Sequence, residues 1–249
     1  MTIENDEDIA GLMHVGRIVA ACLQHMGAAL EPGMTTRELD EIGEAFLARH
    51  GAQSAPRVTY SFPGATCISV NEQVAHGIPG DRRVEAGDLV NVDVSACARG
   101  YFADTGGTFQ VPPYTPETTR LCLATRRALA DAMHEARAGA ALNRIGRAIE
   151  RRARKAGFEV IRDLCSHGVG RALHEEPAQI YGYYEPRDRR ILREGQVITI
   201  EPFLTTGGPH VTQDADGWTL LTRPSARAAQ YEHTMIVTRG KPIVVTVAS

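Results

Sequence analysis

The chain has 249 residues, with 27 lysine and arginine residues against 30 aspartate and glutamate residues, and a formal charge of −3. This length suits one large domain or two small ones. No run of basic residues is typical of a nucleic-acid binder, and no apolar stretch approaches the roughly 18 residues that span a bilayer. Residues 1–8 are acidic and lack the apolar segment of a signal peptide. We therefore expect a soluble, cytoplasmic protein that does not enter a membrane.

The predicted elements repeat one plan of two helices followed by strands. Apolar residues at helical spacing predict a helix over residues 7–30, and the capping-box pattern Thr35-x-x-Glu38 opens a second helix that ends near residue 51. Strands are expected at residues 67–70 and 89–109. Helices return at residues 115–138 and 142–156. Further strands follow from residue 159, notably at 197–200, 219–222 and 234–237.

The repeat has a constant spacing. Three pairs of residues lie 106 positions apart, and they are Gly33 with Gly139, Leu39 with Ile145, and Gly51 with Gly157. Because so few identities support it, chance alignment remains an alternative. The repeat predicts two α/β halves related by a pseudo-twofold axis, with the helices in one layer. No Pro-rich or Ser-rich linker separates the halves, so we expect a single domain over residues 1–249.

The cysteines point away from two kinds of site. Five are present, an odd number, with no Cys-x-x-Cys pair: Cys22, Cys67, Cys97, Cys122 and Cys165. A disulfide framework and a thiolate zinc site are therefore not expected.

A first pair of carboxylates lies on a predicted hairpin. Residues 89–95 alternate, so that valines face one way while Asp93 and its polar neighbours face the other. If the turn is centred between Ala98 and Arg99, Asp93 lies opposite Asp104, and directly opposed side chains are roughly 5 Å apart. Two solvent-facing aspartates on a surface hairpin are the alternative. The Asp-Thr-Gly of residues 104–106 also occurs in aspartic proteases, but those sites need two copies and this chain has one.

A second pair of carboxylates flanks a longer hairpin. Glu201 and Glu232 are equidistant from the Asp216-Gly217 turn, which is a strong hairpin signal. A surface role for Glu201, which precedes a proline, is the alternative. His167 lies in a Ser-His-Gly-Val-Gly segment, where glycines permit close backbone approach, although a lone histidine is more often structural than functional.

Together these five residues form a candidate metal site: Asp93, Asp104, His167, Glu201 and Glu232. Four gathered carboxylates repel one another strongly unless cations lie between them. Two divalent ions would balance the four charges, with a neutral imidazole as the fifth ligand. An oxygen-rich set favours manganese, iron or cobalt, with zinc as an alternative. The sequence therefore predicts a hydrolytic centre with two divalent ions about 3.5–4 Å apart.

The chain resembles the type I methionine aminopeptidases. The motifs that carry the resemblance are NEQVAHGIP at 71–79, NVDV at 91–94, DTG at 104–106, SHGVGR at 166–171, HEEP at 174–177, IEP at 200–202 and QYEHT at 230–234. The resemblance runs over nearly the whole chain. It implies the α/β (α+β) pita-bread fold, with two pseudo-twofold-related halves, a curved antiparallel sheet, and helices on its outer face.

The resemblance also implies a role for each candidate residue. Asp93 would bind one metal ion, His167 and Glu201 the other, and Asp104 and Glu232 both. Glu201 would act as general base for a water held between the ions, while His174 would donate to the developing oxyanion and His76 would contact the substrate amide. The implied activity is removal of N-terminal methionine from nascent proteins and peptides whose second residue is small.

The methionine pocket departs from the pattern of the family. Phe62, Cys67 and Trp218 match positions that line the pocket in the family. Pro56, Thr59 and Leu173 replace the cysteine and aromatic residues of many bacterial members. Each change removes a contact with a thioether worth roughly 0.3–1.5 kcal/mol. Two alternatives therefore stay open, which are a paralogue of broader or Xaa-Pro specificity and a peptide-binding protein without catalysis.

The loop between the two glutamates bears on partners. Relatives that act on nascent chains often carry lysines there, whereas residues 203–231 contain only Arg223 and Arg227 as basic residues. We therefore expect weak ribosome association, and an auxiliary rather than a housekeeping copy of the enzyme. We also expect a monomer.

Overall fold

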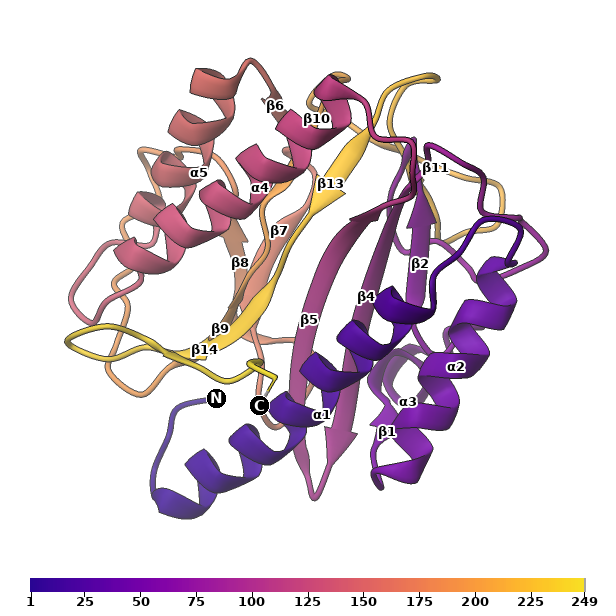
Figure 1. Cartoon of the computed structure of the whole chain (residues 1–249). Helices are drawn as coiled ribbons and strands as arrows, with labels where there is room; N and C mark the ends of the chain where they lie inside the picture. The colour runs from indigo at the N-terminus through magenta and orange to yellow at the C-terminus, as the bar shows by residue number, and fades with distance from the viewer. Residues whose placement is uncertain (249) are drawn as a thin grey trace.

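The computed structural model describes residues 1–248 and contains four long helices and one short one (Figure 1). Their bounds are α1 Asp6–Ala29, α2 Thr36–Arg49, α3 Ala55–Tyr60, α4 Pro116–Glu135 and α5 Asn143–Ala156. The capping box predicted for α2 is present, with Thr35 and Glu38 each accepting from the other's backbone N–H. The four long helices confirm the prediction. Helix α3 was not predicted, because six residues are too few to show a helical period.

The strands form a mostly antiparallel framework. Their bounds are β1 Gln53–Ser54, β2 Cys67–Val70, β3 Gln73–Ala75, β4 Leu89–Ala98, β5 Tyr101–Gln110, β6 Glu159–Val160, β7 Cys165–Gly168, β8 Glu175–Tyr181, β9 Val197–Ile200, β10 Phe203–Thr205, β11 Thr212–Gln213, β12 Leu220–Leu221, β13 Ala228–Gln230, β14 His233–Ile236 and β15 Ile243–Val244. One sheet joins β1, β4, β2 and β5, and another has the order β15-β14-β9-β7-β8. Two smaller sheets, β13-β10-β6 and β11-β12-β3, complete the framework.

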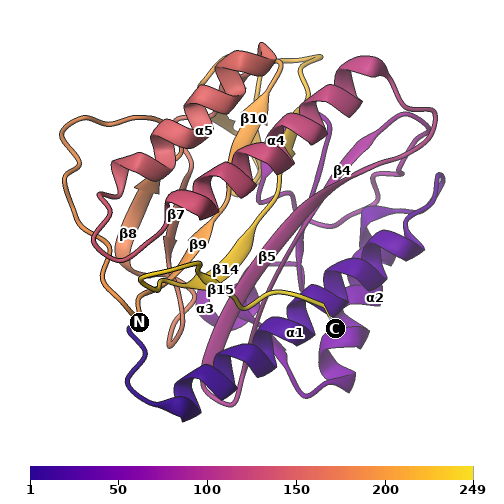
Figure 2. The ribbon, with the colours of Figure 1, turned by 60° about the vertical axis from the view of Figure 1, so that its left-hand side comes forward.

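The two larger sheets meet along β5 and the segment between β13 and β14. Thr234 Oγ1 accepts from Asp104 N at 2.9 Å and donates to Asp104 O at 2.8 Å. Glu232 N donates to Gly106 O at 2.9 Å. These bonds join strands from the two halves of the chain side by side, as Figure 2 also shows.

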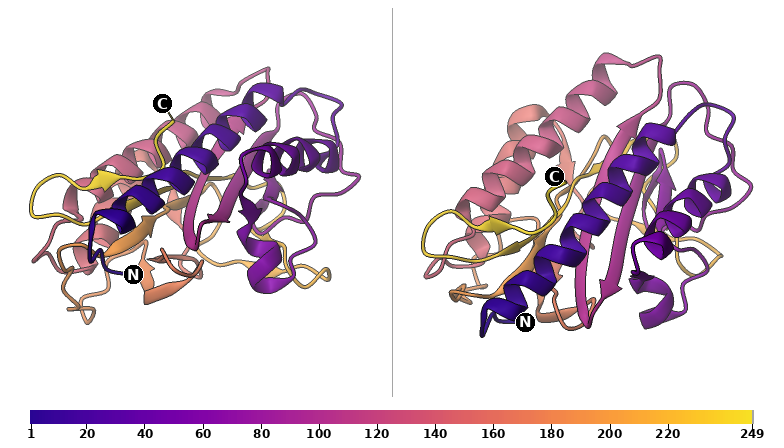
Figure 3. Two further views of the ribbon diagram at one scale, coloured as in Figure 1. Left: turned by 90° about the horizontal axis from the view of Figure 1, so that it is seen from below. Right: turned by 60° about the horizontal axis from the view of Figure 1, so that its bottom comes forward.

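The long helices cover one side of these strands (Figure 3). Helix α1 packs on β4 and β5, whereas α4 packs on α5, β13 and β10. Two apolar clusters result, one under α1 and α2 and one under α4 and α5. Helix α3 packs instead against β1 and β4, beside the candidate site. Within residues 1–248, no helix is long and apolar enough to cross a membrane.

The predicted repeat is present in the order of the elements. Helices α2 and α5 are both 14 residues long. The four paired glycines all have positive φ angles, +92° and +86° at Gly33 and Gly139, and +69° and +79° at Gly51 and Gly157. Only glycine adopts this backbone conformation without strain. The glycine pairs therefore mark equivalent turns before and after α2 and α5.

The register predicted for the first hairpin is wrong by two residues. Asp93 pairs with Gly106, and Asp104 pairs with Ser95. The turn is centred between Arg99 and Gly100, which both have positive φ, as a two-residue hairpin turn requires. A shift of two residues keeps side chains on the same face, so the two carboxylates are diagonal neighbours and not directly opposed.

The register predicted for the second hairpin is confirmed. Ile200 pairs with His233 and Phe203 pairs with Gln230, so the intervening Glu201 and Glu232 come to the same level. The same register continues to the tip, where Thr212 pairs with Leu221 around the Asp216-Gly217 turn.

Candidate metal centre

All five predicted ligands line the junction of the two larger sheets. Asp93 and Asp104 come from β4 and β5, and His167 comes from β7. Glu201 directly follows β9, and Glu232 directly precedes β14. Asp104, His167 and Glu232 are only 6%, 5% and 2% exposed. The junction therefore holds charged side chains where burial is costly unless they are paired.

The ligand atoms lie close enough to share metal ions. One atom from each of Asp104, His167 and Glu232 lies within 4.8 Å of the other two. His167 Nε2 is 3.9 Å from Asp104 Oδ2 and 3.5 Å from Glu201 Oε1. Asp93 lies close enough to Asp104 for each carboxyl group to influence the pKa of the other.

The imidazole of His167 is held in a single orientation. Its Nδ1 lies 2.9 Å from Gly168 O, so Nδ1 carries the proton and Nε2 presents a lone pair toward the carboxylates. Burial, and then the neighbouring His174, lower the pKa of His167 to about 3. The ring is therefore neutral near pH 7, which is the form that binds metal ions.

Two polar side chains that were not predicted orient the glutamates. Thr199 Oγ1 donates to Glu201 Oε1 at 3.1 Å and accepts from the backbone N–H of His167 at 3.1 Å. Gln230 Nε2 donates to Glu232 Oε2 at 3.0 Å, and its Oε1 accepts from Asn91 Nδ2 at 2.9 Å. Thr199 and Gln230 each precede a ligand by two residues, so strand alternation could have placed them on the ligand face.

Burial and crowding make the carboxylates reluctant to ionise. Burial raises the pKa of Asp93 to about 6. The pKa of Asp104 is raised well above its usual range by burial, and then by the charges of Glu232 and Asp93. Burial, followed by the neighbouring carboxylates, also raises the pKa of Glu201 and of Glu232 well above the usual range.

The cluster fits divalent cations in its donor set and in its unsatisfied atoms. Asp104 Oδ1 and Glu232 Oε1 are buried and have no hydrogen-bond partner among the described residues. A buried carboxylate oxygen without a donor is expensive. Bound cations would satisfy both oxygens and balance the four carboxylate charges. Without bound cations, these buried carboxylate oxygens would not stabilise the folded protein.

An apolar pocket opens beside the cluster. A cleft of about 360 Å³ is lined by four of the five candidate ligands, all except Glu232, and by apolar side chains on its wall. The wall residues include Pro56, Phe62, Cys67, Leu173, Phe203 and Trp218. The rings of Phe62 and Trp218 meet edge to face, with centroids 5.2 Å apart. Of the three residues that depart from the family pattern, Pro56 and Leu173 line the cleft, whereas Thr59 is not among its lining residues.

The two further predicted histidines line the same cleft. The ring of His174 lies beside that of His167, with centroids 4.1 Å apart and the ring planes tilted by 45°. Its Nδ1 lies 2.6 Å from the hydroxyl of Tyr60, a residue that was not predicted. His76 follows β3 and has a φ of +56°, a conformation that costs a non-glycine residue roughly 1–3 kcal/mol. Burial lowers the pKa of both His174 and His76, so both rings are neutral near pH 7.

The hydroxyl of Tyr60 pairs with one ring nitrogen of His174. Burial raises the pKa of the Tyr60 phenol, so it keeps its proton. The phenol O–H can then donate to Nδ1, which leaves the ring proton on Nε2. The sequence held no signal for this contact, because Tyr60 and His174 are 114 residues apart.

A comparison with protein families decides which family this is. The model described as metallopeptidase family M24 matches residues 10–239. The chain belongs to metallopeptidase family M24. This M24 member accordingly uses divalent metal ions, for which the five-residue cluster is the candidate site.

Individual relatives of this M24 chain are methionine aminopeptidases. It is 44% identical over 247 residues to methionine aminopeptidase 2 of Bacillus subtilis, and the alignment covers 99% of each chain. It is 37% identical to the methionine aminopeptidase of Escherichia coli, over 96% of this chain and 90% of the relative. The crystal structure of methionine aminopeptidase from Rickettsia prowazekii superposes with a TM-score of 0.94 at 33% identity, covering 99% of this chain and 100% of the other. The predicted fold class and family resemblance are therefore confirmed.

Proposed function

We propose that this M24 metallopeptidase removes N-terminal methionine from nascent proteins and peptides whose second residue is small. The observation that carries the proposal is the cluster of buried, unsatisfied carboxylate oxygens at the foot of an apolar pocket. The methionine aminopeptidases that match over 90% or more of both chains support it. Residues 1–249 act as one catalytic domain in this proposal, because both halves of the chain supply ligands.

The proposed ligand assignment follows the family resemblance. Asp93 would hold one ion, His167 and Glu201 would hold the other, and Asp104 and Glu232 would contribute to both. The unsatisfied oxygens of Asp104 and Glu232 support a shared role, since each lies among the other ligands. When bound, such ions would hold the free α-amine of the peptide and lower the pKa of the attacking water.

The side chains around the ligands perform the proton transfers. Glu201 takes the proton of the attacking water, because its carboxylate lies among the other candidate ligands, 3.5 Å from His167 Nε2. His174 is neutral and donates from Nε2 to the oxygen of the scissile amide as negative charge develops there. His76, which lines the same cleft, contacts the same amide and assists proton transfer to the leaving amine.

The pocket selects the first residue of the peptide. A methionine side chain would place its sulfur against the rings of Phe62 and Trp218 and the thiol of Cys67, contacts worth roughly 0.3–1.5 kcal/mol each. Leu173 and Pro56 offer aliphatic surface in place of sulfur or an aromatic ring, which favours a less strict selection. A paralogue of broader or Xaa-Pro specificity is therefore the second candidate function.

We also propose a cytoplasmic monomer with weak ribosome association through residues 203–231. A monomer is sufficient because one chain supplies every ligand. Weak association is expected because Arg223 and Arg227 are the only basic residues of that loop.

A panel of peptides tests the proposal. Metal-free protein is reconstituted in turn with Mn²⁺, Fe²⁺, Co²⁺ and Zn²⁺ and assayed on peptides beginning Met-Ala, Met-Pro, Leu-Ala and Ala-Pro. Release of methionine from Met-Ala that exceeds release from Leu-Ala at least tenfold supports methionine selectivity. Comparable cleavage of Leu-Ala, or faster cleavage of Ala-Pro, would favour the second candidate.

Two glutamate variants separate catalysis from peptide binding. Glu201→Gln should abolish turnover while peptide binding stays nearly intact. Glu194→Gln is the matched control, because Glu194 is exposed and pairs with Arg239 away from the cleft. Unchanged turnover in Glu201→Gln would remove Glu201 as the base. Peptide binding without turnover in the reconstituted wild type would favour a non-catalytic binding protein.

A further inference from the structure

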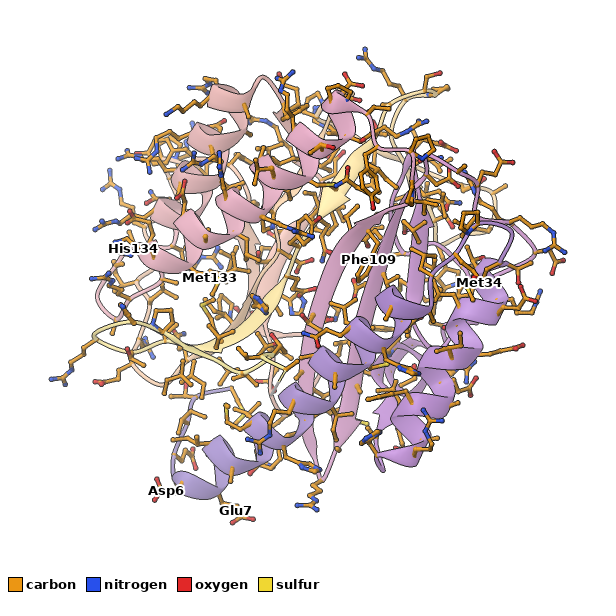
Figure 4. The ribbon with its side chains drawn as sticks, viewed as in Figure 1. Asp6, Glu7, Met34, Phe109, Met133 and His134 are labelled. Carbon is orange, nitrogen blue, oxygen red and sulfur yellow. The ribbon has the colours of Figure 1, made fainter. Side chains whose placement is uncertain are left out.

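The outer surface of α4 and α5 is strongly basic. The two helices carry nine basic and four acidic residues, a net charge of +5, in a chain with a net charge of −3. Helices α1 and α2 carry three basic and seven acidic residues, a net charge of −4. In Figure 4, the labelled Asp6 and Glu7 project from the start of α1, far from α5. The helical layer is therefore electrically polarised between its two halves.

The basic residues of α5 form one exposed stripe. Arg147, Arg151, Arg154 and Lys155 follow the i, i+4, i+7 and i+8 spacing that brings side chains to one helix face. All four are exposed. Among the described residues 1–248, no carboxylate oxygen lies within 4.0 Å of the charged nitrogens of Arg147, Arg151 or Lys155. The one acidic residue of α5, Glu150, is already paired with Arg154 and Arg162.

Two shallow hollows extend the stripe to each side of Lys155. One, of about 500 Å³, is lined by Arg147, Arg151 and Tyr184. The guanidinium of Arg147 lies 4.2 Å from the centre of the Tyr184 ring, so its N–H edges remain free. The other hollow, of about 280 Å³, lies between α4 and α5 and is lined by Arg120 and Arg127. We name the six exposed residues Arg120, Arg127, Arg147, Arg151, Arg154 and Lys155 the basic face.

We propose that the basic face binds the phosphate backbone of RNA. Guanidinium groups recognise phosphate through paired N–H donors, and stacking on an aromatic ring holds them ready to do so. Helix α5, with 14 residues, is about 21 Å long and can meet several phosphates of one strand. Hydrolysis of peptides uses none of these residues, because the basic face is on the helical layer and the cleft is not.

Other anionic partners fit the surface less well. A membrane or a protein partner needs apolar side chains among the charges, to enter the lipid or to form the centre of an interface. Among the described residues, Leu123 is the only exposed large apolar side chain of α4 and α5. The choice of RNA over DNA rests on the proposed function, because a nascent protein acquires its N-terminus during translation of messenger RNA.

The sequence alone pointed away from nucleic acid because the basic residues form no continuous run. They recur at helical spacing on two helices and become one surface only when α4 packs on α5. The binding assay decides between that expectation and the present proposal.

Fluorescence anisotropy tests the proposal. It measures the affinity of metal-free protein for a labelled 20-nucleotide RNA hairpin between 50 and 200 mM salt. The variant combines Arg147→Gln, Arg151→Gln and Lys155→Gln, since glutamine preserves helix propensity. The matched control combines Arg17→Gln, Arg37→Gln and Arg49→Gln, three exposed arginines of α1 and α2. Both proteins lose three positive charges and keep the cleft residues.

The basic-face variant should bind RNA at least about tenfold more weakly at 50 mM salt. Its slope of log affinity against log salt should fall by about one for each lost phosphate contact. The control should stay within about twofold of wild type. No wild-type binding at 50 mM salt, equal losses in both variants, or tighter binding to a DNA duplex or to phosphatidylglycerol vesicles would each overturn the proposal. Because the assay contains neither metal nor peptide, a failed peptidase assay does not affect its result.

Discussion

Replacing Glu232 by Gln should stabilise the metal-free protein. The Glu232 carboxylate is buried beside Asp104, with ligand atoms no more than 4.8 Å apart. Two unit charges at that distance repel by about 3 kcal/mol at an effective dielectric constant of 20. Protonation relieves part of this repulsion at pH 7.5, so a neutral amide should raise the free energy of unfolding by about 1–3 kcal/mol. Gln230 could still donate to the new amide oxygen.

The same change from carboxylate to amide should have the opposite effect on the free energy of unfolding at Asp40. This buried carboxylate accepts from the backbone N–H groups of Ala65 and Thr66 and from Thr66 Oγ1, at 2.7–2.9 Å. In Asp40→Asn, an amide NH₂ replaces one acceptor and faces an N–H donor. The free energy of unfolding should therefore fall by about 1–3 kcal/mol.

Chemical denaturation in the presence of a chelator measures both variants at pH 7.5. Thermal unfolding provides a second reading, with about 2–4 °C expected for each kcal/mol in a chain of this size. At 100 times the dissociation constant, Mn²⁺ should stabilise wild type by about 2.7 kcal/mol for each occupied site, and should stabilise Glu232→Gln much less. A metal-free Glu232→Gln protein less stable than wild type, or one that gains as much stability from Mn²⁺, would refute the electrostatic argument.

Three further predictions concern the cleft. Tyr60→Phe removes the donor to His174 Nδ1. The kcat on a Met-Ala peptide should therefore fall about tenfold, with KM within twofold, as for the loss of a modest transition-state hydrogen bond. An unchanged kcat in steady-state assays would exclude this positioning role. Trp218→Ala removes the edge-to-face pair with Phe62, worth about 0.5–1.5 kcal/mol. The kcat/KM for Met-Ala should therefore fall several-fold, and should fall more than the kcat/KM for Leu-Ala. Equal losses on both peptides would count against a methionine pocket. Protons compete with metal ions for carboxylates whose pKa values are raised. Mn²⁺ should therefore bind more tightly as the pH rises through about 6, the pKa of Asp93. Calorimetry that finds the same affinity at pH 5.5 and 7.5 would contradict this.

Local patterns predicted most of the fold and the placement of the candidate ligands. Strand alternation placed Asp93 on a polar face, and the distance from the Asp216-Gly217 turn placed Glu201 level with Glu232. These signals work because side chains alternate strictly along a strand, and a tight turn fixes the register of both its strands.

The errors arose where several turn geometries were compatible with the sequence. Ala98-Arg99-Gly100 allowed two centres, and the positive φ of Gly100 selected the later one. The prediction still placed Asp93 and Asp104 on one face, because the error was two residues and not one. A one-residue error would have separated the carboxylates.

Contacts between distant segments were beyond sequence reasoning. The Tyr60–His174 hydrogen bond depends on α3 reaching the turn after β7, and the basic face depends on the packing of α4 against α5. The stripe on α5 has a helical period in the sequence, but the contact of Tyr60 with His174 and the joining of α4 to α5 arise only when separate elements meet in the folded chain.

Calorimetric titration of chelator-treated protein with Mn²⁺, followed by assay of the same sample on a Met-Ala peptide, tests the central claim most directly. The account predicts two ions bound per chain, release of protons on binding, and methionine release that appears only as the sites fill. Full activity before any Mn²⁺ is added, or saturation without detectable binding, would contradict it.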